Sequence, residues 1–105
     1  MRGPHRGEVW WGEHEDAGRR PYLVMTRDAA IGVLDRVIAV PLTRTIRDIP
    51  TEVRLDRQDG VPQECAASID NIGAVPTGDL TERICTLTPD RLAQVCEALA
   101  VAVDC

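Results

Sequence analysis

Residues 36–43 read Arg-Val-Ile-Ala-Val-Pro-Leu-Thr, and this is the stretch of the chain that most strongly favours a β-strand. Branched aliphatic side chains and threonine fit the pleated, half-buried surface of a sheet. Pro41 has no N–H to donate to a neighbouring strand, so we expect it at a sheet edge or a bulge. A single strand is not stable alone, so the segments on either side must supply its partners.

Shorter runs on both sides have the same character, and we expect strands at residues 7–11, 21–26, 51–55 and 66–72. In the first of these, Trp10 and Trp11 must point to opposite faces, so we expect one ring in the core and the other exposed. Residues 12–19 are polar and hold two glycines, which favours a mobile surface loop. We expect a helical turn at residues 27–32, a turn at Asp59-Gly60 and a short helix near residues 78–85.

The end of the chain has the clearest pattern. Thr88 can cap a helix, Pro89 suits its first position and Asp90 favours its positive end. The apolar residues that follow at helical spacing are Leu92, Val95, Cys96, Leu99 and Val103. This predicts a helix that buries that face. Five or six short strands with one closing helix predict a mainly β fold, either a strongly bent antiparallel sheet or a partly open barrel.

The length of 105 residues corresponds to one domain, which we place at residues 1–105. No run approaches the roughly 18 apolar residues that a membrane span needs, and the first residues lack the apolar stretch of a signal peptide. We therefore expect a cytoplasmic protein.

The charges are unevenly distributed. All 12 basic residues are arginine, which excludes Walker-type phosphate loops and Schiff-base chemistry because both need a lysine. Residues 1–57 hold 10 Arg against 9 Asp and Glu, whereas residues 58–105 hold 2 Arg against 8. A polyanion can therefore meet a basic face built from the first half, despite the net charge of -5.

Several enzyme classes find no support in the side chains present. The cysteines at positions 65, 85, 96 and 105 form no C-x-x-C pair, so we expect no metal and no cofactor. His14 lacks the second histidine of a metalloprotease motif, and Ser68, the only serine, lacks the glycines of a nucleophile elbow. The carboxylates are scattered, which argues against a two-metal phosphodiesterase.

Arginine and threonine remain as candidates for chemistry. Arg20 precedes Pro21, whose ring holds its neighbour extended, so Arg20 should begin a strand in a defined direction. Thr43 ends the strand at residues 36–43, a place from which side chains commonly project into a cleft. By themselves, Arg20 reads as a solvated charge at the start of a strand and Thr43 as an ordinary β-former at a strand end, so composition alone names no function.

Five segments, at residues 6–11, 20–25, 37–43, 49–53 and 68–72, together resemble the MazF/PemK family of toxin endoribonucleases in sequence, order and spacing. The resemblance covers nearly the whole chain. It implies a small SH3-like, PemK/CcdB-type partly open barrel that dimerises, cuts single-stranded RNA at short motifs without metal, and is silenced by a MazE-like antitoxin.

The resemblance also assigns residues. By position, Arg20 is similar to the family's catalytic arginine and Thr43 to its catalytic threonine, while Ile49, Asp70 and Asn71 fall where the family lines its base-recognition groove. Asp70-Asn71 stands where many relatives have Glu-Gln, and the next position but one holds glycine where arginine is common. The recognition sequence therefore cannot be transferred.

From these residues we expect metal-free cleavage by the ribose 2′-hydroxyl, with the guanidinium of Arg20 gripping the phosphate. Arg44 and Arg47 are candidates for flanking phosphates. Trp11 is a candidate stacking platform, with Trp10 and Tyr22 as alternatives. We assign no general base: His14 and Glu13 are candidates by residue type, but the sequence does not place either beside the phosphate. Ala98 and Val101 are candidates for a two-fold interface, and an acidic, disordered antitoxin segment would cover the arginines.

Two other readings stay open. A small barrel of this kind also serves as a pure binding module, for example a gyrase poison such as CcdB. A toxin that folds but has lost its activity is the third alternative. The pair Arg20 and Thr43 discriminates between them, because only the nuclease requires both side chains.

Overall fold

The computed structural model describes residues 3–14 and 18–104. It contains seven strands, a short helix and a long one, and three single-turn 3-10 helices. The strands are β1 (Glu8–His14), β2 (Gly18–Val24), β3 (Arg36–Thr43), β4 (Glu52–Leu55), β5 (Cys65–Ser68), β6 (Gly73–Pro76) and β7 (Leu80–Thr86). The helical elements are α1 (Asp28–Ile31), η1 (Arg57–Asp59), η2 (Ile69–Asn71), η3 (Thr77–Asp79) and α2 (Pro89–Val103).

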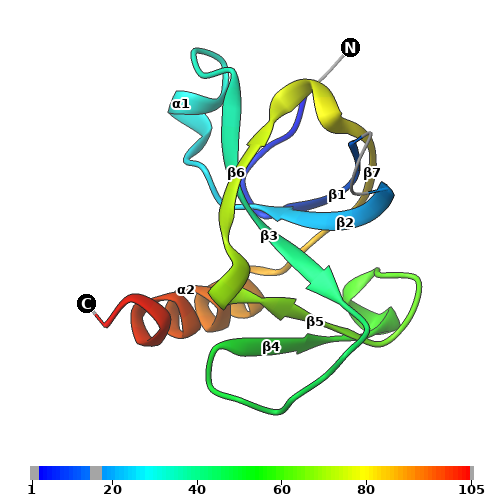
Figure 1. Ribbon diagram of the computed structural model, residues 1–105, viewed down its shortest axis with the longest axis vertical. Coiled ribbons are helices and arrows are strands. Elements are labelled where there is room, and N and C mark those ends of the chain that lie inside the picture. Colours follow the sequence, from blue (N-terminus) through cyan, green and yellow to red (C-terminus); the bar gives the residue numbers. More distant parts are fainter. Residues whose placement is uncertain (1–2, 15–17, 105) are drawn as a thin grey trace.

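All strand pairs are antiparallel, and the strand order is β4-β5-β3-β2-β1-β7 with β6 also paired to β3. The sheet bends strongly but does not close, and α2 lies across one end of it (Figure 1). This confirms the predicted class, a mainly β, partly open barrel with a C-terminal helix. None of the described helices is long and apolar enough to cross a membrane.

Strand β3 organises this sheet because it has partners along both sides. Its residues 36–39 pair with β6, its last two residues pair with β5, and residues 39–41 pair with β2. Pro41 lies between the β6 and β5 pairs, where a missing N–H costs no ladder hydrogen bond. Of the two expected settings, the sheet edge is wrong, since β3 is internal, and the pairs that β3 makes with β2, β5 and β6 in the described residues show no bulge; the proline occupies a junction between two partners.

The core lies between the concave side of the sheet and α2. Its centre consists of Val9, Leu23, Leu55, Ile69 and Val95, each at most 1% exposed. A smaller apolar cluster around Val24, Val37 and Leu80 occupies the other side of the sheet. Strand residues alternate between these two clusters because successive side chains point to opposite faces.

Helix α2 begins as predicted, with the Thr88 hydroxyl accepting from the Arg91 amide at 3.2 Å and proline in the first turn. The buried face is rotated from the predicted one. Val95 and Ala98 are buried, whereas Cys96 is exposed and Val103 is 54% exposed. Positions 95, 98, 99 and 102 form the i, i+3, i+4, i+7 stripe, and α2 packs against η2 and β4.

The structure corrects three segments. Residues 12–14 and 18–19, expected in a loop, extend the β1–β2 hairpin through the pairs Gly12↔Arg20, Glu13↔Arg19 and His14↔Gly18, while residues 15–17 lie outside the described part. Residues 80–85, expected as a short helix, belong to strand β7. The expected strand at residues 66–72 is shorter, because η2 follows it from Ile69.

The two tryptophans do point to opposite faces, but neither ring is fully buried or fully exposed. Trp10 packs against the smaller cluster and donates from Nε1 to the buried carboxylate of Glu8 at 3.0 Å. Trp11 is half-buried beside Arg19. The expectation of one core ring and one exposed ring is therefore wrong, since both lie at the boundary.

Candidate active site

A pocket of about 360 Å³ opens where β2 and β3 separate. We call it the β2–β3 pocket. It is lined by Trp11, Arg19, Arg20, Pro21, Leu42, Thr43, Arg44, Thr45, Val61, Pro62, Gln63 and Cys65. Its volume lies in the range of small-ligand sites, roughly 300 to 1,000 Å³.

Pro21 explains why the strands separate here. The Met25 amide donates to the Ile38 carbonyl, so the odd-numbered residues of β2 turn their backbone groups towards β3. Continuing the register from Tyr22↔Pro41 would place the nitrogen of Pro21 against Leu42, and proline has no proton to donate. The ladder therefore stops at Tyr22.

Arg20 and Thr43 lie two positions beyond this last pair, one on each strand, and would face each other if the register continued. Both line the β2–β3 pocket. The structure thus brings together the two residues that the sequence singled out. Arg20 is exposed, and it has no ion-pair partner among the residues in the described ranges.

Thr43 has a defined hydrogen-bonding role. Its Oγ1 accepts a hydrogen bond from the Thr45 amide at 3.1 Å. A hydroxyl has one proton and two acceptor lone pairs, so this contact orients the oxygen and leaves the proton available to donate. The side chain is half-buried at the pocket wall, which suits it to hold an oxygen of a bound anion.

The β2–β3 pocket is electropositive. Arg19, Arg20 and Arg44 contribute to its lining, and no Asp or Glu is among the described lining residues. A cleft lined by one sign of charge concentrates oppositely charged ligands. The arrangement can bind a phosphodiester and present several N–H donors to its oxygens.

Trp11 forms a stack at one wall of the β2–β3 pocket. The guanidinium carbon of Arg19 lies 4.3 Å from the centre of the Trp11 ring, and Arg19 also donates to Glu82 at 3.3 Å. An arginine above an aromatic ring gains a cation–π attraction, and its planar group is itself a stacking surface. A base can stack on the outer face of this pair.

The opposite wall contains residues that the sequence did not indicate. Val61, Pro62 and Gln63 come from the segment between η1 and β5, and the Gln63 amide oxygen faces Arg44. The amide orientation is assigned from its partners: with the oxygen towards Arg44 it accepts from Nε at 2.6 Å and from Nη2 at 3.2 Å, whereas the reverse orientation would set donors against donors. No sequence signal distinguishes Gln63 from other surface glutamines.

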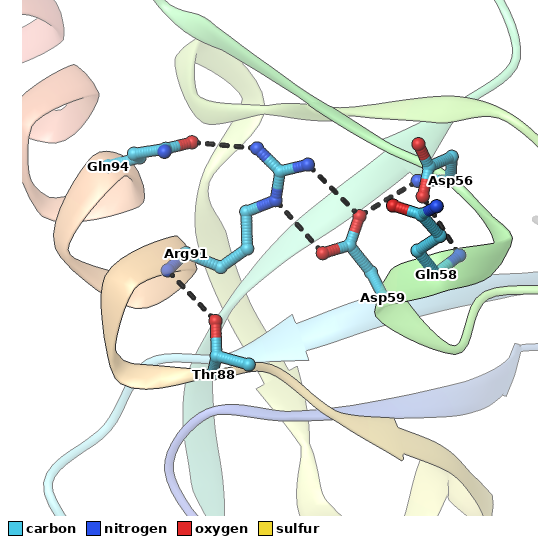
Figure 2. A network of polar contacts seen from close by, with 6 residues as sticks. All are labelled: Asp56, Gln58, Asp59, Thr88, Arg91 and Gln94. Carbon is cyan, nitrogen blue, oxygen red and sulfur yellow. Dashed lines mark hydrogen bonds and ion pairs between the residues drawn. The ribbon is translucent and has the colours of Figure 1, made fainter.

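An ion pair fastens this wall to α2. Figure 2 shows Arg91 reaching Asp59 with two donors, Nε to Oδ1 at 2.9 Å and Nη2 to Oδ2 at 3.3 Å. The Asp56 amide also donates to Asp59 at 2.9 Å, and Arg91 Nη1 donates to Gln94 at 2.9 Å. Burial raises the pKa of Asp59, but the Arg91 and Asp56 hydrogen bonds with the Arg91 charge outweigh it and leave that pKa lowered.

Cys65 lines the β2–β3 pocket as an uncharged thiol. Burial, followed by the negative charge of Asp59, raises the pKa of the Cys65 thiol to about 11. The thiolate is the nucleophilic form of cysteine, so near neutral pH this side chain is unsuited to nucleophilic catalysis. No group of three His, Cys, Asp or Glu side chains is placed to hold a metal ion within the described ranges.

Four predicted site residues lie outside the β2–β3 pocket. Arg47, Ile49, Asp70 and Asn71 instead surround the start of β4, where Ile69 donates to the Thr51 carbonyl. We call them the β4 cluster. Arg47 contacts Glu52 through its amide at 2.8 Å and its guanidinium at 3.3 Å.

Within the β4 cluster, the polar side chains of η2 are engaged with neighbouring hydroxyls. The Thr51 hydroxyl donates to the Asp70 carboxylate at 2.5 Å, and Asn71 donates to the Ser68 hydroxyl at 2.8 Å. Ile49 is 39% exposed. Thr45 and the residues after it connect this cluster to the β2–β3 pocket along one strand-to-strand segment.

The candidate bases are not in the β2–β3 pocket. His14, at the end of β1, lies 3.3 Å from the Asp79 carboxylate. Glu13 is exposed and pairs across the hairpin with Arg19. Neither residue lines the pocket.

Comparisons with known proteins identify the family of this chain. Residues 5–103 match the family model of the PemK-like, MazF-like toxins of type II toxin–antitoxin systems. The chain is 44% identical over 103 residues to the probable endoribonuclease MazF5 of Mycobacterium tuberculosis, covering 97% of this chain and 94% of that relative. It is 37% identical to the probable endoribonuclease MazF2 of the same species, covering 95% and 98%.

Solved structures give the same result. The fold matches that of the M. tuberculosis toxin MazF-mt6 with a TM-score of 0.85 and 30% identity, covering 92% of this chain and 96% of that one. It matches equally, at 0.85 and 30% identity, a mycobacterial endoribonuclease in complex with its cognate antitoxin, covering 96% and 95%. The chain belongs to the PemK/MazF family of toxins.

Proposed function

We propose that this protein is an endoribonuclease toxin that cleaves single-stranded RNA, with Arg20 and Thr43 as its catalytic residues. The observation that carries the proposal is that these two side chains, on different strands, line one electropositive pocket. Family membership and the endoribonuclease relatives support the same activity.

The chemistry follows from what RNA itself supplies. The ribose 2′-oxygen attacks the adjacent phosphorus, the P–O5′ bond breaks, and a base takes the 2′-hydroxyl proton while the 5′-oxygen gains one. The products are a 2′,3′-cyclic phosphate and a 5′-hydroxyl end. Because nucleophile and phosphorus belong to the same nucleotide, the protein contributes mainly position and charge, and no metal-bound water is required.

Arg20 and Thr43 have distinct roles in this scheme. Negative charge develops on the nonbridging oxygens as the 2′-oxygen adds, and the planar guanidinium of Arg20 can hold two of them. The Thr43 hydroxyl accepts a hydrogen bond from the Thr45 amide and donates one to a phosphate oxygen or to the 2′-hydroxyl. We assign no side chain as the general base, since His14 and Glu13 both lie outside the β2–β3 pocket.

RNA contacts extend on both sides of the scissile phosphate. We place one nucleobase against the Trp11–Arg19 stack and flanking phosphates near Arg44 and Arg47. Ile49, Asp70 and Asn71, in the β4 cluster, would then meet bases further along the strand, as the family resemblance implies. Single-stranded RNA fits because its bases are free to turn towards these side chains.

We also propose three properties of the protein in the cell. It acts in the cytoplasm, as a homodimer, and is neutralised by a MazE-like antitoxin. Val101, 57% exposed on α2, is a candidate for the two-fold interface, whereas Ala98 is buried within the subunit. An acidic antitoxin segment would compete with RNA for the arginines of the β2–β3 pocket.

The test compares wild type, Arg20→Ala and Thr43→Ala on total RNA, with 5′-hydroxyl ends mapped by sequencing. Removing one electrostatic donor typically lowers a rate by about 100- to 1,000-fold, so both variants should lose most cleavage while remaining folded. Arg36→Ala is the matched control, since Arg36 is exposed on the same sheet but outside the β2–β3 pocket. Purified wild type that cuts no RNA, or that leaves 3′-hydroxyl ends, would overturn the proposal and favour a binding module.

A further inference from the structure

We propose that Gln63, held by Arg44, determines specificity by selecting at one RNA position a base with a keto group, guanine or uracil, over the amino bases adenine and cytosine. This inference rests on the proposed function and adds a recognition element in the β2–β3 pocket, separate from the residues of the β4 cluster. The expected selectivity arises from which hydrogen-bonding groups, donors or acceptors, the protein presents to the base.

The first step is the contact between the two side chains. The Gln63 carbonyl oxygen accepts from both Nε and Nη2 of Arg44, at 2.6 and 3.2 Å, while both residues line the β2–β3 pocket. An unrestrained glutamine can rotate its amide and offer either a donor or an acceptor. Here the oxygen is occupied by two donors, so the NH₂ group remains as the part of the amide that a ligand can meet.

The second step is the polarity of the surroundings. Arg44 carries further N–H donors and no acceptor, and so do Arg19 and Arg20 in the same pocket. No carboxylate is among the described lining residues, and the hydroxyls of Thr43 and Thr45 can each donate as well as accept. A base entering near Gln63 therefore meets mostly donors.

The third step follows from the edges of the four bases. Guanine O6 and uracil O4 are acceptors, whereas adenine N6 and cytosine N4, at the equivalent positions, are amino donors; N7 accepts in both purines and does not discriminate between them. An amino group turned towards Gln63 would leave two donors unpaired against each other, which costs more than a missing contact. The pair of Gln63 and Arg44 thus favours keto bases.

The wall that holds Gln63 is fixed before RNA binds. Asp59 and Arg91 tie the preceding turn to α2, as Figure 2 shows, and Arg57 Nε donates to the Pro62 carbonyl at 3.2 Å. Gln63 follows Pro62 directly, so its backbone is restrained on one side by a ring and a hydrogen bond. A side chain that is ordered before RNA binds discriminates better between bases, because binding does not have to order it.

The experiment sequences the 5′-hydroxyl ends produced from an RNA library with randomised positions around the cut. Wild type, Gln63→Glu and Gln63→Ala are compared, with Gln58→Glu as the control for added charge on the same segment outside the β2–β3 pocket. We expect one position in the wild-type profile to prefer keto over amino bases by roughly 5- to 150-fold, the range for a well-formed polar contact to a base edge.

Gln63→Ala should flatten that one position and leave the others unchanged. Gln63→Glu keeps the contact to Arg44 but offers acceptors instead of donors, so the same position should shift towards amino bases. Should Gln63→Glu cut too slowly to profile, Gln63→Ala decides. An unchanged profile in Gln63→Ala, while wild type cleaves, would overturn this inference alone, whereas a wild type that does not cleave overturns the proposed function and this inference with it.

Discussion

Replacing Asp59 tests how firmly η1, and with it the pocket wall at residues 61–63, is held to α2. In Asp59→Ala, Arg91 loses two charge-assisted hydrogen bonds and the Asp56 amide loses its acceptor. Removing one partner of a fully buried pair costs about 3–5 kcal/mol. Arg91 retains 31% side-chain exposure, so water partly replaces the lost acceptor, and we expect about 2 kcal/mol of lost unfolding free energy.

The assay is a double-mutant cycle of Asp59→Ala, Arg91→Ala and the double variant, measured by urea unfolding. The two side chains are in direct contact, so the cycle should give a coupling energy of about 1–2 kcal/mol. The thermal midpoint of Asp59→Ala should fall by roughly 8–16 °C, since 1 kcal/mol corresponds to about 4–8 °C in a domain of this size. A coupling energy below about 0.5 kcal/mol would refute the view that this pair fastens the wall.

The pH dependence provides a second check. Because the folded protein lowers the pKa of Asp59 below the ordinary value of about 3.9, the contribution of this carboxylate is fully present above that value. It is lost as the pH falls through the lower, folded pKa. The stability gap between wild type and Asp59→Asn should therefore shrink as the pH falls below about 4, and a gap that stays constant down to pH 2 would contradict the assignment.

Two further predictions concern the same region. Gly60→Ala should lower the unfolding free energy, measured in urea, by about 2–4 kcal/mol, because Gly60 has a φ of 104° and an added Cβ would lie 2.6 Å from Cys85 Cβ. The control Gly32→Ala, which has open space around it, should change that free energy by less than about 0.5 kcal/mol. Equal effects of the two variants would refute the steric reasoning. Since burial and the charge of Asp59 raise the pKa of Cys65 to about 11, iodoacetamide at pH 8 should label the exposed Cys96 well before Cys65 in native protein; comparable rates by peptide mapping would show that Cys65 is accessible as thiolate.

The sequence predicted those elements whose side chains carry the periodic signal. Strand β3 has a nearly continuous aliphatic run, and α2 has a capping threonine, an N-terminal proline and a helical repeat. Cys96 was wrongly placed in the buried face because cysteine counts as apolar, while Ala98 was wrongly placed outside that face, at a candidate two-fold interface. In the structure α2 packs against η2 and β4 with Ala98 buried and Cys96 exposed. These tertiary contacts cannot be read from the helical repeat.

The missed strands share a physical reason. The outer part of the β1–β2 hairpin is held by backbone pairing of polar residues and glycines, so it has no hydrophobic alternation to detect. Strand β7 pairs with β1 through two register shifts, which break the alternation of its side chains. Backbone hydrogen bonds stabilise both segments, and a hydrophobic pattern in the sequence reports only on side chains.

The candidate site divides in the same way. Arg20 and Thr43 were identified because each is adjacent to a feature that can be read locally, a proline or a strand end, and because the family resemblance marks both. Gln63 and the Asp59–Arg91 pair were missed, since their importance arises from contacts with residues 19 and 32 positions away in the chain. No local motif announces such contacts.

Pro21 connects the chemistry of the sequence to the geometry of the site. It extends the backbone of Arg20, and by lacking an N–H opposite Leu42 it ends the β2–β3 ladder at Tyr22, two residues after Arg20. Had the ladder continued, Arg20 and Thr43 would be an ordinary cross-strand pair on a closed sheet surface. Because it stops, the strands separate, and the space between them becomes the β2–β3 pocket in which a guanidinium and an alcohol can meet a phosphate.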